Sequence, residues 1–189
     1  RFIMKHIGKS YDKVDAKGIL SGKPSYTGDF VPKDALIIKV LRSPHAQAII
    51  KSIDTSKAKL IPGVEAIFTY EDVPNTRFTL AGQTYPEPSA YDALILDPVV
   101  RYVGDEVALV VAKDEATALK AMPLIKVEYE VQKPVLDLRT AMDHETVVHP
   151  EDDILNHIPV GQDYKRNICV SYHKRVGDIE GELAKCDYV

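Results

Sequence analysis

Three histidines and an acidic run share one stretch of the chain and contain the side-chain types that bind divalent metals. His144, His149 and His157 lie near Glu151–Asp153. Their spacing matches no helical or loop template for a metal site. Polarity rises sharply over the same stretch, which is typical of a solvated segment. We therefore expect a flexible acidic linker over residues 144–166 and no metal site.

Other local patterns that resemble known chemistry fail on spacing or geometry. Gly8-Lys9-Ser10 resembles the end of a phosphate-binding loop, but Ile3 stands where that loop needs a glycine. Asp105 and Glu106 are adjacent, and adjacent side chains on a strand point to opposite faces, so a turn is favoured over a shared acid–base site. His45 lies at a predicted strand end with no carboxylate placed to orient it as a base. The sequence also contains no GxGxxG or GxSxG motif.

The two cysteines give no metal or redox motif. Cys169 and Cys186 form no Cys-x-x-Cys pair, so neither a zinc ribbon nor an iron–sulfur motif can be assembled from them. We expect both to be reduced, structural thiols. The sequence therefore predicts no catalytic, cofactor-binding or metal-ligating residue in this chain.

Charge and hydropathy exclude two classes of partner. The formal net charge is −4 over 189 residues, which gives no basic field for nucleic acid or an anionic membrane surface. No apolar stretch approaches the ~20 residues that a membrane span needs, and the N-terminus has no signal-like apolar core. We expect a cytoplasmic protein with no nucleic acid or membrane partner. The first residue is Arg1, which suggests a piece of a longer open reading frame.

The elements that would position any site centre on a strand–helix–strand unit. Val107–Ala112 is a continuous apolar run, typical of a buried central strand. Asp114 is placed to cap a helix that follows, and Ile125–Val131 alternates as a half-buried strand does. The helix face expected on the sheet consists of Ala116, Leu119 and Met122.

Weaker signals surround that unit. Strands are predicted over residues 35–41, 49–53, 64–70 and 99–103, the last joined to Val107 by a tight connection. Short helices are predicted over 56–60, over 138–142 after Asp137, and over 179–185 after Asp178. Residues 71–98 form a Pro-rich surface loop, and 167–176 has strand character. The fold class is α+β, with a mixed sheet and a few packed helices.

Several segments together resemble one known family. They are Gly22–Asp29, Arg42–Ile49, Ile53–Ala58, Pro62–Val64, Glu71–Pro74, Arg101–Ala108, Val127–Glu130 and Gly177–Ile179 with Ala184 and Asp187. In this order, they resemble the N-terminal part of the large, molybdenum-binding subunit of the xanthine dehydrogenase/aldehyde oxidase family. Gln47 stands where the family usually has a histidine, and Pro123 interrupts a helix that usually continues.

The resemblance implies an α/β hammerhead domain and a division of the chain into four parts. These are an N-terminal linker over 1–21, the hammerhead domain over 22–143, the acidic linker over 144–166, and the start of a molybdopterin-binding domain over 167–189. The family's catalytic residues lie beyond this chain, so none is carried over. The resemblance implies molybdopterin–Mo, [2Fe-2S] and FAD in the full complex, with the molybdopterin-binding domains and the iron–sulfur and FAD subunits or domains as partners.

Two functions remain open from the sequence. In the first, the chain is a scaffold within a molybdenum hydroxylase of purines or related compounds. In the second, it is a stand-alone, non-catalytic binding or interaction domain that shares the hammerhead fold. The sequence does not choose among xanthine, other purines, nicotinate, aldehydes and carbon monoxide as substrate, nor does it give the electron acceptor or oligomeric state.

Overall fold

The computed structural model describes residues 7–23, 26–82 and 89–188. The chain divides into two compact units, Arg1–Leu36 and Ile37–Val189. In the described part of the first unit, helix α1 (Ala16–Leu20) and the 3₁₀ turn η1 (Thr27–Phe30) bury no residue. The apolar core therefore lies in the second unit.

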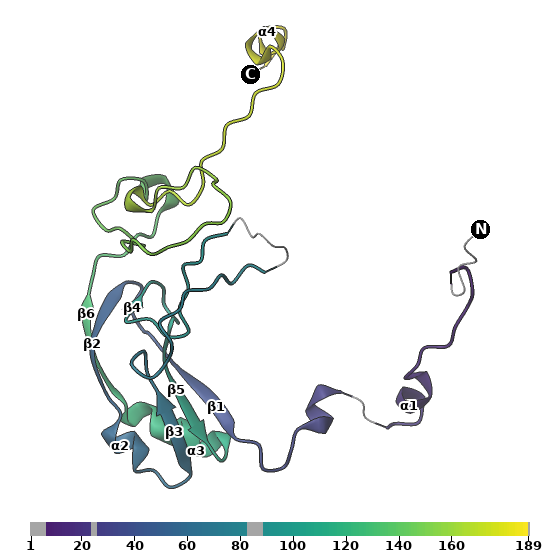
Figure 1. Ribbon diagram of the computed structural model, residues 1–189, viewed down its shortest axis with the longest axis vertical. Helices are drawn as coiled ribbons and strands as arrows, with labels where there is room; N and C mark the ends of the chain where they lie inside the picture. Colours follow the sequence, from purple (N-terminus) through teal and green to yellow (C-terminus); the bar gives the residue numbers. More distant parts are fainter. Residues whose placement is uncertain (1–6, 24–25, 83–88, 189) are drawn as a thin grey trace. The chain divides into compact units, whose positions relative to one another are not determined.

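The second unit is built on two antiparallel sheets of three strands each (Figure 1). The first sheet has the order β1–β5–β3, with β1 Ile37–Arg42, β5 Glu106–Ala112 and β3 Val64–Phe68. The second has the order β4–β2–β6, with β4 Val99–Val100, β2 Ala48–Asp54 and β6 Lys126–Val131. The predicted α+β class, sheets with a few helices, is confirmed. β5 is central in its sheet, as its apolar run predicts.

Two helices cover one side of the first sheet. They are α2 (Ser56–Lys59) and α3 (Glu115–Ala121), and the 3₁₀ turn η2 (Met122–Leu124) follows α3 at Pro123. Asp114 caps α3 as predicted, because its side chain accepts a hydrogen bond from the Thr117 N–H. Ile67 of β3 and Val110 of β5 are buried in the same apolar cluster as the alanines of α3.

The predicted face of α3 is wrong for Ala116 and Leu119, which are exposed, whereas Met122 does pack against the apolar cluster. Thr117, Ala118 and Ala121 are buried, whereas Leu119 is 52% exposed. Small side chains let the helix axis approach the strands closely, and this favours the alanine face over the leucine face.

The predicted strand pair across Gly104 is also wrong. β4 contains only two residues and pairs with β2, in the other sheet from β5. The Asp105 carboxylate accepts the backbone N–H groups of Arg101 at 2.8 Å and Glu106 at 3.0 Å. These bonds stabilise a turn, and β4 and β5 do not pair with each other across it. Gly104 in this turn adopts a φ of +99°, which other residues rarely take.

Residues after β6 contain short turns and no strand among those described. The 3₁₀ turns η3 (Leu138–Thr140) and η4 (Tyr164–Arg166) precede helix α4 (Ile179–Leu183). Asp137 and Asp178 cap η3 and α4 as predicted. The strand predicted over 167–176 is wrong, because the chain reverses at Asn167 (φ 58°) and folds back, with the Ser171 N–H bound to the Val160 carbonyl.

In the part of the chain described, no helix is long and apolar enough to cross a membrane.

Candidate functional site

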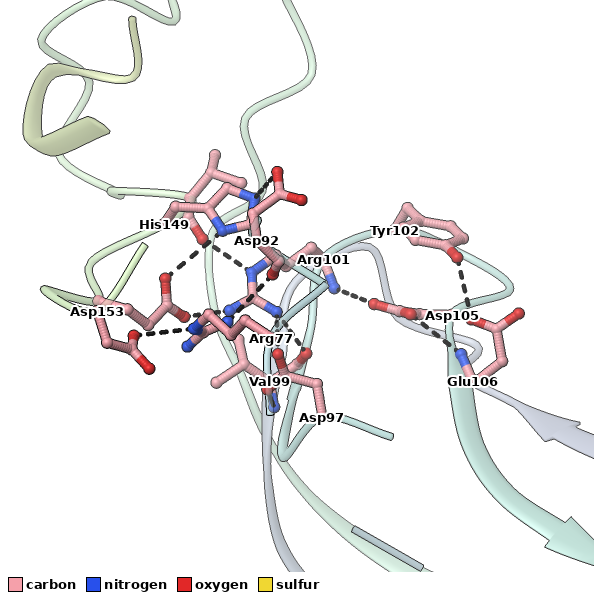
Figure 2. Close-up of polar contacts among 12 residues, drawn as sticks. Arg77, Asp92, Asp97, Val99, Arg101, Tyr102, Asp105, Glu106, His149 and Asp153 are labelled. Atoms are coloured by element: carbon pink, nitrogen blue, oxygen red, sulfur yellow. Dashed lines mark hydrogen bonds and ion pairs between the residues drawn. The ribbon is translucent and has the colours of Figure 1, made fainter. Parts of the chain in front are cut away.

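The most heavily bonded side chain in the site is Arg101, whose guanidinium binds four acceptors (Figure 2). It donates to the Asp97 carboxylate at 2.8 Å and pairs with the Glu151 carboxylate. It also donates to the carbonyls of Val99 and Val148, both at 3.1 Å. We call this arrangement the Arg101 clamp, because it joins the strand-end residues 97–101 to the segment that contains Glu151.

Local backbone structure fixes the position of Arg101. The residue follows β4 directly, and its own N–H donates to Asp105. Asp97 lies before β4 and accepts the Val99 N–H at 2.8 Å. The side chains of Arg101, Asp97 and Glu151 are only 11%, 14% and 18% exposed. These ion pairs are therefore largely withdrawn from water, where the loss of one partner is costly.

Glu151 is held in its charged form. Burial alone raises the pKa of its carboxyl, but the adjacent His149 side chain and the positive charge of Arg101 outweigh burial and lower the pKa to about 2. His149 Nδ1 lies 3.5 Å from Glu151 Oε2, and His149 Nε2 lies 3.9 Å from Asp92 Oδ2. The histidine therefore lies between two carboxylates at distances longer than a good hydrogen bond.

A second arginine supports the same segment from a neighbouring loop. Arg77 donates to Asp153 at 2.8 Å and to the Asp92 carbonyl at 3.1 Å, and its side chain is 11% exposed. Asp152, between the two paired carboxylates, contacts Lys165 at 2.7 Å. Each carboxylate of the acidic run is thus paired with a cation, and Figure 2 shows the Arg77–Asp153 pair. Glu151 is largely withdrawn from water at 18% exposure, whereas Asp153 and Asp152 are solvated, at 64% and 92% exposure.

The arrangement is suited to fixing the chain and not to binding an anion. A guanidinium has five N–H groups, and those of Arg101 already serve two carboxylates and two carbonyls. A phosphate or substrate carboxylate would have to displace these internal partners. The Arg101 clamp therefore positions residues 148–153 against the turn that leads into β5.

A cavity of about 560 Å³ lies beside this segment. Its walls are mostly apolar and include Val135, Val148, Val160 and Val170. The polar wall side chains include Asn167, which already donates to the carbonyls of Ala141 and Thr146 and accepts the Val148 N–H. Its amide therefore supports the loops and is not directed at a ligand.

The structure disperses the other histidines considered from the sequence. His144 Nδ1 accepts the Thr146 N–H at 3.0 Å, and the His157 ring packs edge-on against Tyr91. The His45 ring packs in the same way against Tyr129. Across residues 7–23, 26–82 and 89–188, no group of three or more His, Cys, Asp or Glu side chains has metal-binding geometry.

The acidic pair and the cysteines have separate surroundings. Burial raises the pKa of Asp105, although two backbone N–H groups favour its charged form. Burial also acts to raise the pKa of Glu106, but hydrogen bonds from Arg42 and Tyr102 lower it overall. The Asp105 carboxylate binds backbone N–H groups of the turn, and the Glu106 carboxylate binds the side chains of Arg42 and Tyr102. The thiols of Cys169 and Cys186 are free and exposed.

Of the side chains in the Arg101 clamp, the sequence indicates only Glu151, and it does so as a possible metal ligand and not as a partner of an arginine. Arg101 appeared only as the first residue of a family motif, and Arg77 and Asp97 were not considered. A signal was nevertheless present, because Arg101 has aspartates four residues before and four residues after it. The structure bears this signal out in half, because Asp97 binds the Arg101 guanidinium whereas Asp105 accepts the Arg101 backbone N–H.

The described residues do not fit the cofactors of the resembling family. Four cysteines ligate a [2Fe-2S] cluster, whereas this chain has two. The two buried guanidiniums that would suit the phosphate of a pterin cofactor or FAD are occupied by carboxylates.

Comparison with known proteins identifies the fold. Residues 21–133 match the family model for the aldehyde oxidase and xanthine dehydrogenase a/b hammerhead domain. The chain belongs to this family. The resemblance inferred from the sequence is thereby confirmed, and both sheets with α2 and α3 lie within the matched residues.

Relatives of the hammerhead chain are much longer than the chain itself. It is 40% identical over 207 aligned residues to the probable hypoxanthine oxidase XdhD of Escherichia coli K12, covering 97% of this chain and 22% of that protein. It is 36% identical to the carbon monoxide dehydrogenase large chain of Afipia carboxidovorans, covering 79% of this chain and 18% of that protein. The chain thus spans about a fifth of the length of the curated relatives it matches.

The chain also matches only a small part of much longer chains in solved structures. The hammerhead chain matches a Cu,Mo-CO dehydrogenase with a TM-score of 0.62 and 31% identity, covering 94% of this chain and 22% of that chain. It also matches the aldehyde oxidoreductase of Desulfovibrio gigas with a TM-score of 0.62 and 30% identity, covering 76% of this chain and 16% of that chain.

Proposed function

We propose that this chain is the hammerhead module of the large subunit of a molybdenum hydroxylase and serves there as a scaffold. The observation that carries the proposal is the Arg101 clamp, in which the buried charges are paired within the chain. The module then contributes architecture, and oxidation–reduction chemistry belongs to other parts of the enzyme.

The same proposal supplies the substrate class and the partners. Purines of the hypoxanthine or xanthine type are the favoured substrates, because a relative named as a hypoxanthine oxidase is 40% identical over nearly the whole chain. Molybdopterin–Mo, [2Fe-2S] and FAD would be held by other domains or subunits of the complex. The domain limits predicted from the sequence, 22–143 for the hammerhead and 167 for the start of the molybdopterin-binding part, also remain proposals.

Within this scaffold, the Arg101 clamp sets the direction in which the chain leaves the hammerhead. Residues 148–153 follow β6 and the η3 turn, and Arg101 and Arg77 hold them against loops that precede β5. Ion pairs at two points along the segment restrict both its position and its rotation. The next part of the polypeptide therefore starts from a fixed position.

The test compares the 189-residue chain with the large subunit read from the longer gene. Both are purified, their folding is checked by circular dichroism and thermal unfolding, and molybdenum content and hypoxanthine hydroxylation are measured. We expect a folded 189-residue chain without molybdenum or turnover, and molybdenum in the longer protein assembled with its partners. A folded 189-residue chain that binds molybdenum or hydroxylates a purine would overturn the proposal. A gene that stops at residue 189 would favour a stand-alone binding module.

A further inference from the structure

The cavity of about 560 Å³ has valine walls and one polar end. Two of its polar wall groups bind within the chain: the Asn167 amide binds loop backbone, and the Tyr164 hydroxyl donates to Asn156 at 2.8 Å. Asp92 and His149 also line the cavity, and Figure 2 shows these two side chains facing each other. They form the polar end.

The contacts of the His149 ring determine which of its nitrogens carries the hydrogen in the neutral form. Nδ1 lies 3.5 Å from Oε2 of Glu151, and both atoms are buried without another hydrogen-bond partner among the described residues. Because the Glu151 carboxylate is charged, the hydrogen is favoured on Nδ1, where it faces that charge. Nε2 then presents a lone pair, which accepts a hydrogen bond.

Asp92 places a second acceptor beside Nε2. Its Oδ2 lies 3.9 Å from His149 Nε2, which is too far for a direct hydrogen bond. Across residues 7–23, 26–82 and 89–188, no lysine or arginine forms an ion pair with this carboxylate, because Arg77 binds the backbone carbonyl of Asp92 instead. The polar end therefore presents two acceptors and a negative charge.

The charges around the polar end favour a cation. Two guanidiniums lie among four carboxylates, and the residues concerned are Arg77, Arg101, Asp92, Asp97, Glu151 and Asp153. Three of these carboxylates are paired with the arginines, so the charge of Asp92 remains unbalanced. An anion would have to displace an internal partner, whereas a cation can bind Asp92 without displacing one.

We propose that this cavity binds a primary amine, in its ammonium form, attached to an apolar body of about the size of an aromatic ring. The ammonium N–H groups donate to Asp92 Oδ2 and His149 Nε2, which are close enough to bind one nitrogen together. The apolar body packs against the valine walls and is withdrawn from water there. The volume lies within the range of about 300–1,000 Å³ typical of small-ligand sites.

The experiment follows thiol labelling in the full-length large subunit, because Cys169 lines the cavity and is a free thiol. Cys186, a free and exposed thiol after helix α4, is the internal control. N-ethylmaleimide modification of each is followed by peptide mass spectrometry at pH about 7.5, where imidazole is ordinarily neutral. We expect 2-phenylethylamine, at up to about 10 mM, to slow labelling of Cys169 at least about fivefold and to leave Cys186 unchanged.

Two ligand analogues and two variants test the polar end. 2-Phenylethanol lacks the charge and should need at least about tenfold more for half-protection, and phenylacetate should not protect Cys169. Asp92→Asn should raise the amine concentration for half-protection by at least about tenfold. The matched control is Asp152→Asn, at a side chain that is 92% exposed, and it should leave that concentration unchanged.

Several results would overturn the inference. They are the absence of protection, equal protection by the alcohol, equal protection of Cys186, and unchanged half-protection in Asp92→Asn. A Cys169 that does not label in the folded subunit without amine would also overturn it, because polypeptide then fills the cavity. The analogues are compared in the unmodified subunit, so the test stays valid if Asp92→Asn does not fold. Labelling needs no molybdenum, so the result is independent of the proposed function.

Discussion

Replacement of Arg101 by methionine removes the cation of the Arg101 clamp while keeping a long side chain. The change leaves Asp97 and Glu151 without their shared countercharge, at 14% and 18% exposure, and frees two backbone carbonyls. Breaking a fully buried pair costs about 3–5 kcal/mol, and the remaining exposure reduces this to about 2–4 kcal/mol. For a chain of this size, about 3 kcal/mol lowers Tm by about 6–12 °C.

The assay is urea unfolding of the 189-residue chain, followed by circular dichroism, with a thermal scan beside it. The matched control is Arg139→Met, which removes the same charge. Arg139 is 82% exposed and pairs with Asp137 two residues away, so its loss should leave the free energy of unfolding almost unchanged. Arg101→Lys should recover less than half of the loss, because an ammonium cannot reproduce the planar, forked geometry.

A double-mutant cycle with Glu151→Gln isolates the pair itself. We expect a coupling free energy of about 1–3 kcal/mol between Arg101 and Glu151. If Arg101→Met is no more destabilising than Arg139→Met, or if the coupling is zero, the clamp does not hold the segment and the reasoning from burial is refuted.

Three further predictions concern pH, the face of α3 and its cap. Because the folded-state pKa of Glu151 is about 2, below the ordinary 4.5, its contribution to stability is present above pH about 4.5 and is lost as pH falls towards 2. Glu151→Gln should therefore reduce the loss of unfolding free energy between pH about 4.5 and 2 in urea unfolding. An unchanged pH dependence in this range would contradict the low pKa of Glu151. Ala118→Leu should destabilise by about 1–3 kcal/mol through overpacking, whereas Leu119→Ala should cost less than about 0.5 kcal/mol in urea unfolding; the reverse order would restore the face predicted from the sequence. Asp114→Ala should lower the free energy of unfolding and Asp114→Asn should lower it much less, since the amide oxygen can still accept the Thr117 N–H; equal losses would show that this hydrogen bond is not what stabilises the helix end.

Local sequence signals predicted the elements well where one physical effect dominates. The continuous apolar run of β5 requires a central strand, and it is central. The aspartates at 114, 137 and 178 bind the N–H groups of the turns that follow them. Such signals act within a few residues, so they can be read without knowledge of the tertiary structure.

Predictions failed where the outcome depends on distant partners. Alanine and leucine faces of α3 are both apolar, and only the distance to the sheet selects the alanines. Glu151 looks solvated in sequence because Arg101, which pairs with it away from water, lies 50 positions earlier.

Turnover per molybdenum atom in the assembled enzyme tests the central claim most directly. The full-length large subunit carrying Arg101→Met is assembled with its partners, and hypoxanthine hydroxylation is divided by molybdenum content and compared with the unmodified and Arg139→Met enzymes. A scaffold predicts less assembled enzyme and less molybdenum for Arg101→Met, with kcat per molybdenum and KM unchanged in the enzyme that does assemble. A fall in kcat per molybdenum of about tenfold or more at unchanged assembly would show that this module takes part in the chemistry and would contradict the account.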